Sequence, residues 1–133
     1  MTLRTIFISS LMSISSFCLA APEKELPETL ASPYHLLMMR HADAPGYSDP
    51  TGFDLNNCAS QRNLGANGKK QAAELGAWLK TQGITQAKLL SSPWCRCMET
   101  AKLLNVGDVL SENALGSFFE NRADGKEQTL LLE

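Results

Sequence analysis

Histidine is scarce in this sequence, with only two His among 133 residues. The chain also lacks a strong charge of either sign, because 12 Lys and Arg residues stand against 14 Asp and Glu residues, a formal net charge of −2. That balance argues against a general electrostatic surface for nucleic acid or an anionic membrane. An anionic substrate would therefore need a local cluster of Arg. Internal repeats and low-complexity tracts are absent, and the length is that of one domain at most.

Long hydrophobic runs are missing too. The best candidate, residues 6–19, is uncharged but rich in Ser and too short for a comfortable membrane span. It follows the positive charge of Arg4 and ends at small residues up to Ala20, which is typical of an export signal. We expect residues 1–20 to be a signal peptide cleaved after Ala20, leaving a periplasmic or secreted protein without membrane contact; an uncleaved anchor is the alternative. Loss of Arg4 would shift the net charge to −3.

Cysteines are few, and three of the four (Cys58, Cys95 and Cys97) follow the expected cleavage site. An oxidising compartment favours pairing of two of them. Cys95 and Cys97 are too close in sequence to bridge easily, so we expect Cys58 to pair with one of them. Cys95 and Cys97 do not form a Cys-x-x-Cys pair, and no further metal ligands with suitable spacing are found. We therefore expect neither a metal site nor a cofactor.

The chain opens with irregular segments and one apolar run. Residues 21–33 contain three prolines among charged residues and are expected to be an exposed lead-in. Residues 34–39 are almost wholly apolar, and at this length a buried parallel strand is favoured over a helix. Residues 43–57 are rich in Pro, Gly, Asp and Asn, so we expect a long loop of the kind that often carries function.

Apolar residues recur at steps of three and four from about residue 67 to residue 82, which predicts an amphipathic helix that Gly83 ends. Shorter patterns follow, and they indicate a strand at 88–90, a helix at 95–104, a strand at 106–110 and a helix at 123–132. The alternation of strands and helices predicts an α/β fold with a mainly parallel sheet.

Two expected strands end in basic residues. Arg40 and His41 follow the first strand, and Arg96 lies near the start of the helix that follows the second. Ligands of open α/β sheets bind at the carboxyl ends of the strands. An imidazole can act there as a nucleophile, and a guanidinium matches phosphate oxygens, as does a helix N-terminus. An Arg–His pair alone is weak evidence, and Arg96 could instead pack against Glu99.

Three motifs together resemble those of the histidine phosphatase superfamily, which includes the phosphoglycerate mutases. Residues 39–43 read Met-Arg-His-Ala-Asp, where the family has Arg-His-Gly/Ala, and residues 91–101 read Ser-Ser-Pro-Trp-Cys-Arg-Cys-Met-Glu-Thr-Ala, where it has Ser-Ser-Pro-x-x-Arg-x-x-x-Thr-Ala. Between them, residues 61–72 are similar to the segment that opens the family's first long helix. The resemblance covers about residues 34–107 and is strongest to an exported bacterial branch.

This resemblance implies a three-layer α/β/α fold and hydrolysis of a phosphomonoester through a phosphohistidine on His41. Arg40 and Arg96 would hold the phosphoryl group, and no cofactor would be needed. Glu120 is the best candidate for the general acid by position, with Asp43 as a second possibility. The substrate would be a small phosphorylated molecule or a phosphoprotein. The branch also carries one Cys before each of the two later motifs, which implies a disulfide between Cys58 and Cys95.

The sequence departs from the family in two ways. The family's pocket contains a second His late in the chain, whereas the only other His here, His35, falls inside the first expected strand and is interpreted as structural. Residues 34–133 also end before a further expected strand, so we expect a partial, C-terminally truncated domain. The alternative functions are an inactive module that binds phosphorylated ligands or a partner, and a disulfide-stapled scaffold. No feature indicates an oligomeric state.

Overall fold

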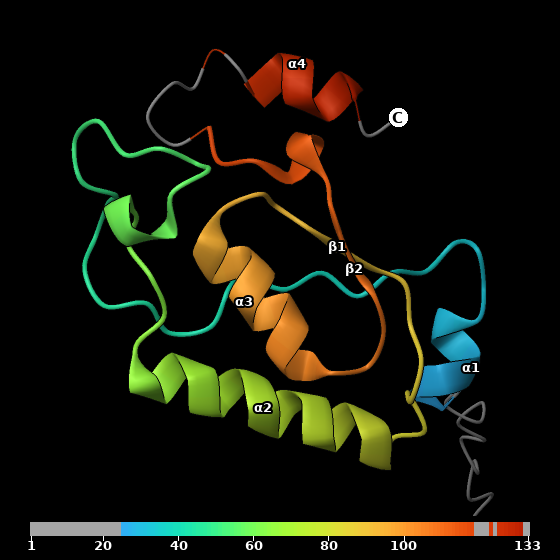
Figure 1. Ribbon diagram of the computed structural model, residues 1–133. Coiled ribbons are helices and arrows are strands. Elements are labelled where there is room, and N and C mark those ends of the chain that lie inside the picture. The colour runs from blue at the N-terminus through green and yellow to red at the C-terminus, as the bar shows by residue number, and fades with distance from the viewer. Residues whose placement is uncertain (1–24, 119–122, 124, 132–133) are drawn as a thin grey trace, which may run out of the picture.

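The computed structural model describes residues 25–118, 123 and 125–131 (Figure 1). The expected signal peptide, residues 1–20, and Glu120 lie outside the described residues. The elements follow in chain order: α1 (Leu26–Leu30), the 3-10 helix η1 (Cys58–Ser60), α2 (Ala66–Thr81), β1 (Leu89–Ser91), α3 (Cys95–Leu104), β2 (Val109–Ser111), the 3-10 helix η2 (Asn113–Leu115) and α4 (Gly125–Leu130).

The sheet within the described residues consists of β1 and β2, which pair in parallel with Leu90 opposite Leu110. Parallel neighbours need a crossover, and α3 supplies it, so the three elements form a βαβ unit. The α/β class expected from the sequence is confirmed. Each strand is displaced from its predicted position, by one residue for β1 and by more for β2.

Helix predictions from apolar spacing are confirmed. α2 begins one residue before the predicted start, and α3 has the predicted bounds. α3 ends at Leu104 and is capped by Asn105, whose φ of 51° is the left-handed conformation that commonly closes a helix. α4 covers the middle of the predicted helix at 123–132. Helical periodicity is a strong signal because it repeats over several turns.

The two long helices lie side by side (Figure 1) and enclose the small core. Leu79 of α2 and Leu104 of α3 pack with Val106, which is only 1% exposed. Gly76 allows this approach, because a Cβ at that position would collide with the carbonyl group of Leu104. Within the expected lead-in, the short helix α1 has no buried residue, although Leu26 packs partly against the core.

The prediction of a buried strand at residues 34–39 is wrong. The segment is not a strand and is largely exposed, with Tyr34 at 91% and Met38 at 76%. A strand needs a neighbour that supplies backbone hydrogen bonds, and among the described residues β1 is paired with β2 alone. His35, expected inside the strand, is exposed as well. Apolar composition predicted burial here, but it cannot supply a pairing partner.

The expected loop at residues 43–57 is present and leads into η1, whose first residue forms a disulfide with the first residue of α3. The bond joins Cys58 to Cys95, as the resemblance implied, with 5.6 Å between their Cα atoms. It ties the end of the loop to the start of α3. Within the described residues, no helix has the length and apolar content needed to cross a membrane.

Candidate functional site

Hydrogen bonds through Thr100 place the His41 segment against α3. The backbone N–H of Ala42 donates to Thr100 Oγ1 at 3.0 Å, and that hydroxyl donates to the carbonyl oxygen of Arg96 at 2.7 Å. Thr100 is 3% exposed, so both bonds are shielded from water. One buried hydroxyl therefore holds the segment carrying His41 next to the helix turn that carries Arg96.

The ring of His41 is fixed in one tautomer. Its Nδ1 lies 2.7 Å from the carbonyl oxygen of Ala42, which can only accept, so Nδ1 carries the proton and Nε2 keeps its lone pair. Burial lowers the pKa of His41, the bond to Ala42 opposes this, and the charges of Arg96, Arg40 and Arg62 lower it further. The imidazole is therefore neutral at pH 7, as a nucleophile must be.

Three guanidinium groups act on this imidazole, one more than the sequence interpretation assigned. Arg40 and Arg96 were expected, whereas Arg62 stood in a recognised motif without a role. Burial lowers the pKa of Arg62 and the charge of Arg96 lowers it again, whereas the carboxylate of Asp49 opposes both. Repulsion between partly buried cations is relieved by an anion.

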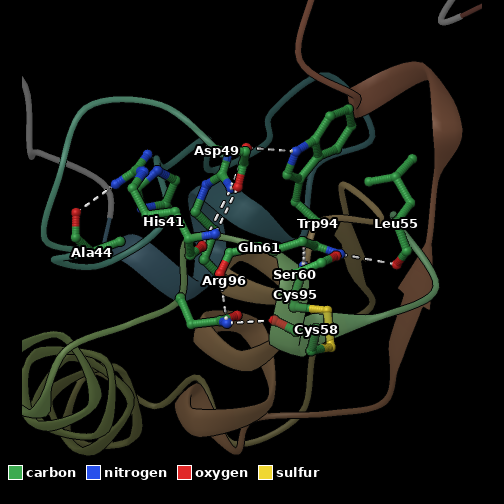
Figure 2. Close-up of polar contacts among 12 residues, drawn as sticks. His41, Ala44, Asp49, Leu55, Cys58, Ser60, Gln61, Trp94, Cys95 and Arg96 are labelled. Carbon is green, nitrogen blue, oxygen red and sulfur yellow. Dashed lines mark hydrogen bonds and ion pairs between the residues drawn. A yellow bond between two sulfur atoms is a disulfide. The ribbon is translucent and has the colours of Figure 1, made fainter. Parts of the chain in front are cut away.

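The side chains of Arg62 and Arg96 are each anchored through Nη1, and Figure 2 shows Arg96 with its partner Asp49. Arg62 donates from Nη1 to the carbonyl oxygen of Ala44. Arg96 donates from Nη1 to both carboxylate oxygens of Asp49, at 2.8 and 2.9 Å. In each guanidinium, Nε is buried and has no hydrogen-bond partner within the described structure. Buried N–H donors are rarely left unpaired, so two of them in adjoining cations indicate a place for an external acceptor.

Arg96 is buried, with 8% of its side chain exposed, and its ion-pair partner is Asp49 rather than Glu99. Glu99 instead pairs with Lys69 of α2 at 2.8 Å, so the alternative of packing against Glu99 does not hold. Arg40 differs from the other two cations because it is exposed. The site therefore has two anchored guanidiniums and one at the solvent edge.

Gln61 completes the frame behind the Arg residues. Its Nε2 donates to the carbonyl oxygens of Asp54 and Leu55, each at 3.0 Å, and its Oε1 accepts from the backbone N–H of Cys95 at 3.0 Å. The first amide of α3 is thus used by a side chain and does not face an anion. The side chains of Arg62 and Arg96, rather than that amide, provide the donors of this site.

The candidates for the general acid divide between described and undescribed residues. Glu120 lies outside the described residues. Asp43 is exposed, and its backbone N–H donates to Gln71 Oε1 at 3.0 Å.

No group of residues that could hold a metal ion is found in the described part of the chain. A shallow hollow lined by Phe118 and α4 shares no residue with the Arg–His cluster.

Comparison with known proteins gives a single finding. A sequence model of the histidine phosphatase superfamily (branch 1) matches residues 36–115, which include His41 and all three Arg residues of the site. No curated protein and no solved structure matches the chain. The family match covers more than half of the sequence, and it includes His41 and the Arg residues whose charges lower the pKa of that imidazole. The chain therefore belongs to the histidine phosphatase superfamily.

Proposed function

We propose that this protein hydrolyses phosphomonoesters through a covalent phosphohistidine on His41. The observation that carries the proposal is the pair of buried, unpartnered Nε donors of Arg62 and Arg96 in a cluster that also acts on a neutral imidazole. A tetrahedral dianion satisfies those donors and offsets the cationic repulsion. Membership of a phosphatase superfamily supports the same reaction class.

In the first step, Nε2 of His41 attacks phosphorus and the bond from phosphorus to the ester oxygen breaks. The electron pair of that bond goes to the leaving oxygen, which takes a proton from a carboxylic acid. Glu120 remains the proposed acid, with Asp43 as the second choice. The hydrogen bond from Nδ1 to Ala42 keeps the ring oriented and stabilises the positive charge that develops on it during attack.

In the second step, water gives a proton to the carboxylate left by the first step and attacks the phosphohistidine. The bond from nitrogen to phosphorus breaks, its electron pair returns to Nε2 and inorganic phosphate leaves. Arg40, Arg62 and Arg96 hold the phosphoryl oxygens through both steps, where negative charge gathers in the transition state. Arg62 and Arg96 keep their geometry because each is fixed at Nη1. This preorganisation lowers the cost of reordering donors during the reaction.

The setting of the reaction is also a proposal. We propose that the protein acts in the periplasm or outside the cell, because the disulfide between Cys58 and Cys95 suits an oxidising compartment. We further propose that the domain has the three-layer α/β/α arrangement of the family. The substrate is proposed to be a small phosphorylated molecule or a phosphoprotein.

Turnover of an aryl phosphate by the purified protein tests the function. We expect release of phosphate that His41→Ala abolishes and Arg96→Ala strongly reduces. His35→Ala is the matched control, because it removes the other His, which is exposed, and should leave turnover unchanged. Turnover that persists in His41→Ala would refute the mechanism. Phosphate binding without turnover, lost in Arg96→Ala, would favour the alternative of a non-catalytic phosphate-binding module.

A further inference from the structure

Asp49 lies in the loop at residues 43–57, and its carboxylate accepts four hydrogen bonds, two of them from the guanidinium of Arg96. Its Oδ1 accepts from the backbone N–H of Arg62 and from Arg96 Nη1, both at 2.8 Å. Its Oδ2 accepts from Arg96 Nη1 at 2.9 Å and from Trp94 Nε1 at 3.1 Å. Only 7% of its side chain is exposed. One buried carboxylate therefore connects the loop, the segment before α2 and the first turn of α3.

The carboxylate engages only one end of the Arg96 guanidinium. All the side-chain hydrogen bonds of Arg96 in the described structure leave from Nη1, whereas Nε is buried and unpartnered. Arg62 repeats the pattern, with Nη1 on a carbonyl oxygen of the same loop and a free Nε. A guanidinium grasps a tetrahedral oxyanion best through two neighbouring N–H groups. Anchoring at Nη1 leaves the opposite edge for such a ligand.

We propose that Asp49 is a positioning residue for phosphoryl binding, which holds Arg96 by Nη1 so that its Nε edge faces the phosphoryl group. The inference rests on the phosphate site proposed above. The opposite interpretation is that Asp49 substitutes for the ligand and must leave before phosphate binds. Two observations favour positioning: Asp49 has three partner residues rather than one, and the Nε donors stay unpaired while it is in place. A stand-in for the ligand would be expected to satisfy those donors.

Positioning also fits the charges. The site gathers the three positive charges of Arg40, Arg62 and Arg96 around a neutral imidazole. The ionised Asp49 cancels one of them and leaves two, which matches a phosphomonoester dianion. The hydrogen bonds from Arg62 and Arg96 outweigh the effect of burial and lower the pKa of Asp49, so the carboxylate stays ionised at neutral pH.

Calorimetric titration with inorganic phosphate separates the two interpretations, because they predict opposite signs. We expect Asp49→Asn to weaken phosphate binding by about tenfold, by analogy with the loss of an outer partner that orients a metal ligand. Asp49→Glu, which restores the charge, should recover part of the affinity. The matched control is Asp108→Asn, which removes one exposed negative charge just before β2 and should change the affinity little. Equal or tighter binding by Asp49→Asn would overturn the inference.

A second measurement on the unaltered protein does not depend on folding of a variant. The chain has two Trp residues, and the indole N–H of Trp94 donates to Asp49, whereas exposed Trp78 provides an internal reference. On addition of phosphate, we expect the NMR signal of the Arg96 Nε–H proton to move downfield, because a buried donor without a partner gains an acceptor, while the Trp94 indole N–H keeps its protection from exchange. Faster exchange at Trp94, with Trp78 unchanged, would show that phosphate expels Asp49 and would overturn positioning. Absence of phosphate binding to the unaltered protein would refute the proposed function itself.

Discussion

Reduction of the disulfide between Cys58 and Cys95 should cost the protein a large part of its stability. The bond closes a loop whose ends are 37 residues apart in sequence. For that length, the chain-entropy relation gives about 13 cal/mol/K of restriction in the unfolded chain, or about 4 kcal/mol at 25 °C. Small domains are stable by only about 5–15 kcal/mol, so this single bond carries a sizeable share.

The effect can be measured by urea unfolding of the oxidised protein and of the same protein held reduced. With a typical slope of about 2 kcal/mol/M, we predict that reduction lowers the unfolding midpoint by about 2 M. Cys97→Ser is the matched control, because it removes the free, half-buried thiol and leaves the disulfide intact. The control should retain the midpoint of the oxidised protein and lose it on reduction.

The disulfide also supports the site. It joins η1 to the first residue of α3, immediately beside the bond from Cys95 N–H to Gln61. We therefore expect the reduced protein to bind phosphate more weakly even below its unfolding transition. Coinciding midpoints for the oxidised and reduced forms, with unchanged phosphate affinity, would refute this reasoning.

Three further predictions concern the frame of the site. Thr100→Val removes the acceptor of the Ala42 N–H and should lower the free energy of unfolding by about 1–3 kcal/mol, as measured by chemical unfolding. It should also reduce aryl phosphate hydrolysis, and unaltered turnover would contradict the prediction. Gly76→Ala places a Cβ against the carbonyl group of Leu104 and should lower the free energy of unfolding by about 1–3 kcal/mol, as measured by thermal unfolding. An unchanged melting temperature would argue against close packing of α2 and α3. Burial and the neighbouring cations lower the pKa of His41 from 6.5, so its NMR titration should have a lower midpoint in the folded protein than in the urea-unfolded chain. Because the unfolded chain then binds the proton more readily, the protein should lose stability only as the pH falls below 6.5. A higher pKa of His41 in the folded protein would contradict the site.

Much of the helical part of the fold could be predicted from the sequence. The bounds of α2 and α3 follow from apolar residues repeating over several turns, a pattern that depends on local sequence alone. The strand expected at residues 34–39 could not be decided in this way, because a strand is defined by the backbone that pairs with it. Apolar composition predicts a preference for burial and does not create the neighbouring strand.

The candidate site was predicted in part. His41, Arg40 and Arg96 were predicted from motifs and from strand ends, and although the strand before Arg40 is absent, the charges of Arg40 and Arg96 do act on the pKa of His41. Arg62 was overlooked, although its motif was recognised, because nothing local distinguishes a cation that turns toward His41 from one on the surface. Asp49 was overlooked for a similar reason.

Asp49 and Arg96 are separated by 47 residues, and a bond between them depends on how the whole loop folds back over α3. The loop composition indicated function in general terms, since long loops in compact domains often carry it. Which of its acidic residues would be buried could not be read from the sequence. A buried carboxylate is recognised only when its donors are seen around it.

Covalent trapping at His41 tests the catalytic proposal most directly. The protein would be mixed with an aryl phosphate, quenched in alkali within the first turnovers, digested and examined by peptide mass spectrometry, with His41→Ala treated in parallel. We predict one added phosphoryl group on the peptide that contains His41, released when the sample is acidified, and none in the variant. Steady turnover with His41 unmodified and a phosphoryl group on another residue would contradict the phosphohistidine mechanism.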